Sequence, residues 1–446
     1  MRFLIRANSP ISVIAHNYAR DGSGDSFTVL SKEMAGTTYA LSIPHISSIG
    51  YAAIYFFPIK KDTNIDITVV GENSTDSRKI TAKDNATFVY RRSGAAFSLY
   101  ARGNNPYHVV VGVRRYKSDE IAGLTTSMNY MPLPLPAPGC NIGGSQFDCI
   151  SDMKLSNKFT VTPPAQGCPP FDVELQGKSV ADRFSVDPKK PQPVRSWKSN
   201  LGDFGVIRPR SSYLQCVRLG GGKTSEGKTV GPFMDTMPSQ LQFINGTIYF
   251  IARSTNEMMT IIAEENAKKN MSMDNRKIEE KEWKTMKYGN KVVYYCTLKI
   301  TGSEYHSVHS NGYYIAQITG ITNSESSYGY FPALHAITVT PPEPTESTPV
   351  TTRTQPPSPS SSSTPPIKAS TTKKASTTTK ATVPATSTIM TSSIVSSTQG
   401  SKISTSTAPS QSTTSGTSSL IKRNAVVISA FAMALLTLRS PFNTLF

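Results

Sequence analysis

Short runs of alternating apolar and polar residues recur through the first three quarters of the chain. Each run is rich in Val, Ile, Thr, Tyr and Phe and is bounded by Gly, Pro, Asn or Asp, which is typical of half-buried β-strands. The expected strands lie at 10–15, 27–30, 65–70, 108–113, 158–161, 247–252 and 292–300. The pattern predicts an all-β head, with tandem β-sandwich modules or propeller-like modules as the two arrangements left open.

Two segments add detail to this pattern. Residues 259–283 are dominated by Glu and Lys and form the main helical candidate, with a charged, solvated insertion between strands as the alternative. Residues 27–39 and 233–250 share the order strand, loop, strand, and their second strands open with similar Gly-Thr-rich residues. This internal similarity favours duplicated β modules.

The composition changes after the head, and it predicts three regions: a head over 1–338, a stalk over 339–420 and a tail over 421–446. The stalk is dominated by Ser, Thr and Pro and contains few large apolar residues. Such a segment cannot bury enough apolar surface to offset the entropy lost on ordering, so we expect a disordered, mucin-like stalk with O-linked sugars.

The tail contains a short apolar run at 425–438. This run is shorter than the roughly 20 residues that a membrane-spanning helix needs. Small residues precede it across a polar spacer, which is the layout of a glycosylphosphatidylinositol (GPI) attachment signal, with Ser415 and Gly416 as the attachment candidates. The sequence favours such an anchor, and a short membrane span or an unanchored secreted tail are the alternatives.

Several parts of the chain bear on whether the protein is secreted. Residues 1–6 lack the apolar core of a secretory signal, so we expect that the true beginning of the protein lies upstream. Four N-glycosylation sequons and the stalk argue for an extracellular, secreted or membrane-anchored protein. The asparagines of these sequons are Asn73, Asn85, Asn245 and Asn270.

Five cysteines are the disulfide candidates: Cys140, Cys149, Cys168, Cys216 and Cys296. In an oxidising compartment cysteines pair, so an odd number indicates a free thiol or a partner in a missing segment. A local bridge between Cys140 and Cys149 is expected because the two flank a Gly-rich turn. The sequence has neither a pair of closely spaced cysteines nor a cluster of histidines, which are typical of metal sites. No metal or other cofactor is therefore expected.

Charge and motifs give no catalytic assignment. The net charge of +17 is dispersed along the chain, which is typical of a solvated surface, and nucleic-acid binding is not expected. Residues 222–229 satisfy the phosphate-loop pattern, but the Gly and Pro that follow oppose the required helix, so a surface loop is favoured. The sequence thus predicts a protein that is not an enzyme.

Aromatic residues are the candidates for a sugar- or protein-binding face, because ring faces stack on apolar ligand surfaces while hydroxyl groups form hydrogen bonds. The alternative for each is an ordinary place in the core or in a turn. The candidates are Tyr51, Tyr55, Phe56, Tyr90, Tyr313, Tyr314, Tyr328 and Tyr330.

The order of several motifs resembles the IgGFc-binding protein N-terminal domain family. The opening motifs are Ser-Pro-Ile-Ser-Val-Ile-Ala-His-Asn at 9–17, Asp-Ser-Phe-Thr-Val-Leu at 25–30 and Gly-Thr-Thr-Tyr at 36–39. Gly-Pro-Phe-Met at 231–234 with Pro-Ser at 238–239 is similar to a central loop of the family. Asn-Gly-Tyr-Tyr-Ile at 311–315 and Ser-Tyr-Gly-Tyr at 327–330 resemble its closing strands.

The resemblance covers nearly the whole head, about 8–336. It implies a non-enzymatic, β-rich domain of mucus or cell-surface proteins, and the family's association with immunoglobulin Fc is not carried over to this chain. The chain lacks the Cys-rich repeats often joined to the domain. The sequence therefore predicts a displayed head that binds extracellular protein or glycan ligands and is held at a membrane through the tail. The alternatives are a self-associating mucus or matrix component and, remotely, a nucleotide-binding enzyme that uses the loop at 222–229.

Overall fold

The alternation of apolar and polar residues builds the sheets as expected. In β5 (Thr63–Val70), Ile65, Ile67 and Val69 are buried, whereas Asn64 and Asp66 between them are exposed. One face of this strand therefore lies against a core and the other meets solvent. The prediction of an all-β head is confirmed, because antiparallel strands form nearly all of the regular structure.

The computed structural model describes part of the head. The described residues are 5–9, 11–18, 24–47, 49–59, 61–84, 86–117, 125–136, 139–140, 147–153, 158–177, 181–202, 204–210, 213–223, 229–253, 257–288, 291–302, 305–321 and 327–335. The predicted stalk and tail, including Ser415 and Gly416, lie outside these residues. Within the described ranges, no helix has the length and apolar character needed to cross a membrane.

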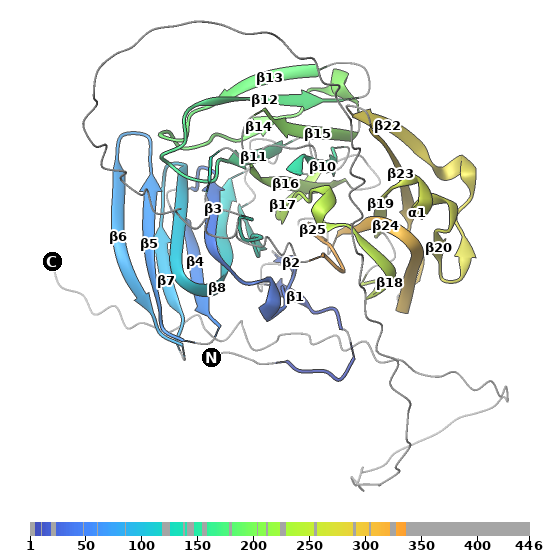
Figure 1. Ribbon diagram of the computed structural model, residues 1–446, viewed down its shortest axis with the longest axis horizontal. Coiled ribbons are helices and arrows are strands. Elements are labelled where there is room, and N and C mark those ends of the chain that lie inside the picture. Colours follow the sequence, from blue (N-terminus) through green and yellow to red (C-terminus); the bar gives the residue numbers. More distant parts are fainter. Residues whose placement is uncertain are drawn as a thin grey trace, which may run out of the picture. The chain divides into compact units, whose positions relative to one another are not determined.

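The seven-stranded sheet is formed by the N-terminal part of the head (Figure 1, blue and cyan). Its central strand is the long β8 (Phe97–Lys117), whose two halves pair with different neighbours. In the described residues its other members are β3 (Gly36–Ile43), β4 (Tyr51–Pro58), β5, β6 (Thr75–Ala82), β7 (Phe88–Arg92) and β9 (Thr125–Tyr130). The C-terminal half of β8 thus lies between β4 and β9, with β7 beyond β4.

Two four-stranded sheets and one two-stranded sheet follow from the described strands. The first four-stranded sheet has the order β10 (Cys149–Asp152), β15 (Phe204–Pro209), β12 (Phe171–Gln176), β13 (Ala181–Val186). The second has the order β14 (Arg195–Ser196), β11 (Lys158–Thr162), β16 (Gln215–Lys223), β17 (Thr229–Thr236). The small sheet pairs β1 (Ile14–Tyr18) with β2 (Gly24–Thr28).

The largest sheet among the described residues has eight strands and is organised by β24 (Tyr305–Ile321). Its other members are β18 (Ile244–Ile251), β19 (Met258–Ala263), β20 (Ser272–Met273), β21 (Arg276–Lys277), β22 (Lys284–Tyr288), β23 (Lys291–Lys299) and β25 (Ser327–Tyr330). Short 3-10 helices connect strands at η1 (Lys32–Met34), η3 (Ser199–Leu201), η4 (Gln240–Gln242) and η5 (Glu280–Glu282).

The expected long helix over 259–283 is wrong. This segment contains β19, a five-residue helix α1 (Glu265–Lys269), the short strands β20 and β21, and η5. The apolar residues at its start explain the difference: Met259, Ile261 and Ala263 are buried in the core of the eight-stranded sheet, so strand pairing prevails over local helix propensity.

The internal similarity noted in the sequence has a structural counterpart. Residues 27–39 belong to the order β2, η1, β3, and residues 233–250 belong to the order β17, η4, β18. In both copies a strand leads through a single 3-10 turn into an eight-residue strand. Each first strand also carries a buried aspartate, Asp25 in β2 and Asp235 in β17.

A buried polar network joins these sheets. The Arg218 guanidinium in β16 donates two hydrogen bonds to the Asp235 carboxylate, at 2.9 and 3.1 Å, and one to the carbonyl oxygen of Asp152 at 3.0 Å. The side chain of Gln317 in β24 also donates to Asp235. Arg218 is fully buried, so each of its bonds replaces one to water.

Asp25 extends this network to the small sheet. Its carboxylate accepts hydrogen bonds from the backbone N–H groups of Ser26, Asn129 and Met234, at 2.7, 2.8 and 3.2 Å. Burial raises its pKa well above the ordinary range for aspartate, although these three donors oppose that shift. Strands from five sheets therefore meet around one set of polar side chains.

Two disulfides close loops in the middle of the head. Cys140 pairs with Cys168, and Cys149 in β10 pairs with Cys216 in β16. The expected local bridge between Cys140 and Cys149 is therefore wrong, because the packing of the two four-stranded sheets brings Cys149 to Cys216 instead. Cys296 is a buried, free thiol, which corrects its place among the disulfide candidates. Two disulfides indicate an oxidising compartment.

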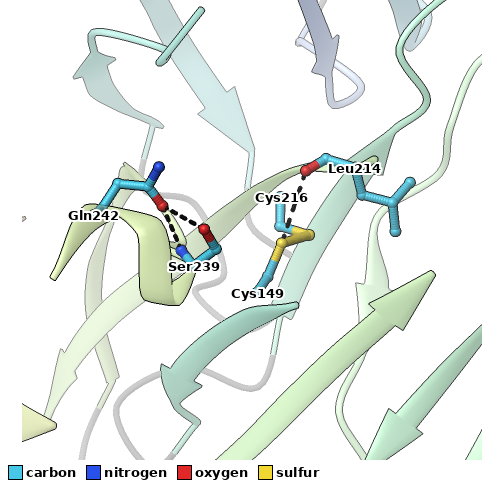
Figure 2. The surroundings of a disulfide bond; sticks show 5 residues. All are labelled: Cys149, Leu214, Cys216, Ser239 and Gln242. Carbon is cyan, nitrogen blue, oxygen red and sulfur yellow. Dashed lines mark hydrogen bonds between the residues drawn. A yellow bond between two sulfur atoms is a disulfide. The ribbon is translucent and has the colours of Figure 1, made fainter. Parts of the chain in front are cut away.

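The Cys149–Cys216 bridge lies beside η4, as Figure 2 shows. The carbonyl oxygen of Pro238 accepts a hydrogen bond from the backbone of Ile150, and the backbone N–H of Met237 donates to the carbonyl oxygen of Cys216. Ser239 then begins η4 with a capping box, in which its backbone N–H and its hydroxyl group both contact the Gln242 side chain. The bridge and the cap together fix this turn to both cysteine-bearing strands.

Candidate binding face

The solvent side of the seven-stranded sheet carries a stripe of aromatic residues along β4. Successive residues of a strand point to opposite faces, so Ile54 and Phe56 enter the core while Tyr51, Tyr55 and Phe57 point outward. The three outward rings are half-buried, and those of Tyr55 and Phe57 stack with their centroids 6.3 Å apart.

Two arginines from neighbouring strands stand beside this stripe. Arg91 of β7 pairs with Ala53, and Arg114 of β8 pairs with Tyr51, so both side chains share the outward face. The Arg91 guanidinium lies over the Tyr51 ring, 5.6 Å from its centroid, which is a cation–π geometry. Both arginines are exposed, and neither forms an ion pair with another residue that the structure describes.

The floor between the rings is made of small residues. Gly112 of β8 lies between Ala53 of β4 and Asn129 of β9 in the strand register. A methyl group at Gly112 would come within 3.1 Å of the Asn129 Oδ1 atom and 4.0 Å of the Tyr55 ring. Glycine here leaves space beside Tyr55. The Asn129 Nδ2 group, next to this space, has no hydrogen-bond partner among the described residues.

Electrostatics link the members of this face, which we call the β4 face and define by Tyr51, Tyr55, Arg91, Arg114 and Asn129. Burial raises the pKa of the Tyr55 hydroxyl, the nearby Tyr51 adds to the shift, and Arg91 opposes it. Tyr55 therefore stays a neutral hydrogen-bond donor across the physiological range. The face offers ring surfaces, cationic donors and an amide, but no carboxylate.

One end of the β4 stripe is covered. His108, opposite Phe57, forms a 3.0 Å hydrogen bond with the carbonyl oxygen of Ser31, and Val110 packs against a small cluster that includes Phe27 and Leu30. This covering explains why Phe57 is the least suited of the three rings to meet a ligand. The open part of the face lies around Tyr51, and Tyr55, opposite Val110, lies at the border of the covered part.

A second hollow lies on the other half of the same sheet, over β5, β6 and β8. It has a volume of about 580 Å³ and is lined by polar residues such as Asn64, Thr81 and Arg102. Lys79 and Asp66 within it form a 3.7 Å ion pair between well-exposed side chains. No aromatic side chain lines this hollow. It therefore lacks the aromatic surface that makes the β4 face the better candidate.

The structure separates the aromatic candidates of the sequence. Tyr51 and Tyr55 belong to the β4 face, and Tyr313 is 53% exposed on β24. The other five lie in the core: Phe56, Tyr90, Tyr314, Tyr328 and Tyr330. Sequence reasoning missed Arg91, Arg114 and Asn129, because only the strand register brings them beside β4.

The phosphate-loop pattern lies in a β-hairpin. β16 ends at Lys223 and β17 begins at Thr229, and these two residues pair with each other. Residues 224–228 lie outside the described residues. A phosphate site of this kind needs a helix after the loop, whose N-terminal N–H groups contact the phosphates, and a strand follows here instead.

The remaining candidate residues are accounted for as follows. Asn73, Asn245 and Asn270 are exposed, and Asn85 lies outside the described residues. Among the described residues, no group of His, Cys, Asp and Glu side chains is arranged to hold a metal ion. His16 bonds to Ser26, and burial lowers its pKa to about 3, with a smaller contribution from Arg253.

Comparison with known proteins adds no assignment. No family model, no curated protein and no solved structure matches this chain. The resemblance to the IgGFc-binding protein N-terminal domain family, which rests on the order of the motifs, stays a prediction.

Proposed function

We propose that this chain is an extracellular surface glycoprotein whose β-rich head binds protein or glycan partners through the β4 face and performs no catalysis. The observation that carries the proposal is the combination of Tyr51 and Tyr55 with Arg91 and Arg114, which form no ion pair with any described residue, above a floor of small residues. Such a surface stacks on apolar faces of a ligand and donates hydrogen bonds to its oxygens.

The chemistry of the face favours ligands rich in oxygen acceptors. Each arginine offers a planar fork of N–H donors, and Tyr55 adds a neutral hydroxyl donor. An acidic glycan or an acidic loop of a protein supplies the matching carboxylate or hydroxyl oxygens, while the rings contact the apolar side of a sugar or of an aliphatic side chain.

The sequence supports the proposal that the head is held at a cell surface. The two disulfides support passage through an oxidising compartment, and the Ser/Thr/Pro-rich segment at 339–420 supports a glycosylated spacer. We propose that the tail holds the protein at the membrane through a lipid anchor. Because many heads on one surface act together, weak single contacts suffice for adhesion.

An array of glycans and secreted proteins, probed with the full chain, tests this proposal. Binding to a discrete set of ligands that falls in the Tyr55→Ala variant supports it. Binding only to other copies of the chain would instead favour a self-associating mucus or matrix component, and an array without any binder would contradict the proposal.

A further inference from the structure

Two of the sequons border the same strand. In the sequon Asn245-Gly246-Thr247, Thr247 of β18 pairs with His309 of β24, and the Thr247 hydroxyl lies 2.8 Å from the His309 Nδ1 atom. In the sequon Asn270-Met271-Ser272, Ser272 of β20 pairs with the same His309 from the other side. The two sequons therefore flank β24.

Both asparagines lie toward the same end of β24. β18 and β20 are each antiparallel to β24, so they run parallel to each other. Asn245 precedes Thr247 by two positions of β18, which is about 7 Å along an extended strand, whereas Asn270 lies at the C-terminal end of α1, whose Ala267 contacts Ser310 of β24. From His309 this displacement leads toward the residues of β24 that follow Ser310.

An exposed bulge occupies that end of β24. Ile244 pairs with Tyr314 and Gly246 with Ser310, so Asn245 lies opposite the three residues 311–313. Tyr313 in this bulge is 53% exposed. On the other side α1 packs against the same stretch, since the Ser310 hydroxyl donates to the carbonyl oxygen of Ala267 and Asn270 caps the C-terminal end of α1.

The free edge of β18 also lies at this place. β18 pairs with β24 and with no other strand of the described residues. Unpaired edges template aggregation, and proteins commonly protect them with charged side chains. Two other edge strands of the head follow this rule, with Arg78 and Lys79 in β6 and Arg183 in β13, whereas β3, β9 and β25 are also uncharged. The eight residues of β18 include no charged side chain.

We infer that N-linked glycans on Asn245 and Asn270 cover the bulge of β24 and shield both Tyr313 and the uncharged edge of β18. Asn245 and Asn270 are exposed, so the folded head has room for a glycan on each. A hydrated glycan performs at this edge the protective role that charged residues perform in β6 and β13.

The distribution of sequons separates this shielded region from the β4 face. No sequon falls within β4, β7, β8 or β9, whereas two converge on β24. The glycans on Asn245 and Asn270, which flank β24 of another sheet, thus leave the β4 face open to ligands. This inference rests on the extracellular location in the proposed function, but it does not depend on the choice of binding face.

Glycopeptide mapping and radical footprinting test the inference on the full chain, secreted from animal cells behind an added signal peptide. The folded protein is treated with an endoglycosidase, and hydroxyl-radical labelling of Tyr313 is compared before and after. Tyr305, which is 41% exposed at the opposite end of β24, is the internal control. We expect occupied sites at Asn245 and Asn270, and labelling of Tyr313 that at least doubles after deglycosylation while that of Tyr305 changes little.

Variants give the second readout. Asn245→Gln/Asn270→Gln is expected to raise the aggregated fraction in light scattering, whereas Asn73→Gln, at the exposed turn between β5 and β6, is the matched control and stays monodisperse. Enzymatic deglycosylation of folded wild-type protein should reproduce the effect, which separates shielding from a folding defect. Occupied Asn73 with empty Asn245 and Asn270, or unchanged Tyr313 labelling, would overturn the inference alone. Secreted protein without sugar at any sequon would also contradict the proposed extracellular glycoprotein.

Discussion

Arg218 of β16 and Asp235 of β17 form a fully buried, two-pronged ion pair at the point where strands of several sheets meet. The Arg218 guanidinium also lies 5.2 Å from the centre of the Phe233 ring and bonds to the backbone of β10. This pair explains how strands of different sheets are fixed around a shared polar centre.

Removal of one partner of this pair should destabilise the head strongly. Arg218→Met leaves the Asp235 carboxylate buried without its cation, which typically costs about 3–5 kcal/mol. Urea denaturation followed by tryptophan fluorescence measures the free energy of unfolding. Lys79→Met, which removes the exposed ion pair with Asp66, is the matched control and should leave that free energy nearly unchanged. Equal effects of the two substitutions would contradict the role of the buried pair.

The two disulfides should contribute unequally to stability. The Cys149–Cys216 bridge closes a loop with a sequence separation of 67, and the Cys140–Cys168 bridge closes one of 28. Each contributes about 2–4 kcal/mol through the entropy of the unfolded chain, and the longer loop adds about 0.8 kcal/mol. Paired Cys→Ala variants of each bridge, compared by thermal unfolding, should rank in this order. Greater loss from the Cys140→Ala/Cys168→Ala variant would contradict this ranking.

Cys296 should not react with thiol reagents in the folded protein. Burial raises its pKa to about 12, with a smaller contribution from Glu282, so the reactive thiolate is scarce at neutral pH. A thiol reagent should therefore label no cysteine of the native chain and one cysteine, Cys296, after unfolding without a reductant. Labelling of Cys140 or Cys149 in that experiment would contradict the observed pairing.

Buried histidines should make the head less stable in acid. Burial lowers the pKa of His108 to about 4, against about 6.5 in the unfolded chain, so the unfolded state binds more protons between these values. The free energy of unfolding should then rise from pH 4 to pH 6.5, by up to about 3 kcal/mol from His108. Asp25, with its raised pKa, acts in the opposite direction over this range.

Because these effects oppose each other, the test compares two proteins. Denaturation curves of the wild type and of His108→Gln are recorded at several pH values, and the difference between their unfolding free energies isolates His108. A difference that shrinks steadily as the pH falls from 6.5 to 4 fits the prediction. A difference that does not depend on pH would contradict it.

The sequence predicted strands well where one face of a sheet enters a core. The expected strand at 65–70 became β5, and that at 292–300 became β23, because their alternation matches the pleat of a strand. The helical candidate over 259–283 was wrong. Its many Glu and Lys residues favour a helix locally, but Met259 and Ile261 are buried in the core of the eight-stranded sheet.

Only part of the candidate site could be predicted from the sequence. Tyr51 and Tyr55 were among the aromatic candidates, but the sequence predicted no strand at 51–58, and Phe57 was missed although it shares their face of β4. Arg91, Arg114 and Asn129 belong to other strands, and their positions depend on a register that a single sequence does not encode locally. The disulfide partners could not be predicted either, because Cys149 meets Cys216 only through the packing of two different sheets.

Substitution of the β4 face should affect binding and leave folding intact. Tyr55→Ala and Arg91→Ala change side chains that are half-buried or exposed, outside the main core, so we expect only small changes in the free energy of unfolding. Circular dichroism and thermal unfolding check this for each variant. A large loss of stability would mean that these residues serve the fold, and it would remove the β4 face as a dedicated binding site.

The most direct measurement is a parallel probe of one array of glycans and secreted proteins with three forms of the full chain. These are the wild type, Tyr55→Ala/Arg91→Ala, and the control Lys79→Ala/Arg102→Ala in the polar hollow of the same sheet. The account predicts a discrete set of ligands whose apparent affinity falls about tenfold or more in the first variant, a loss of about 1.4 kcal/mol, and is unchanged in the second. Equal binding by all three forms would contradict the assignment of the β4 face.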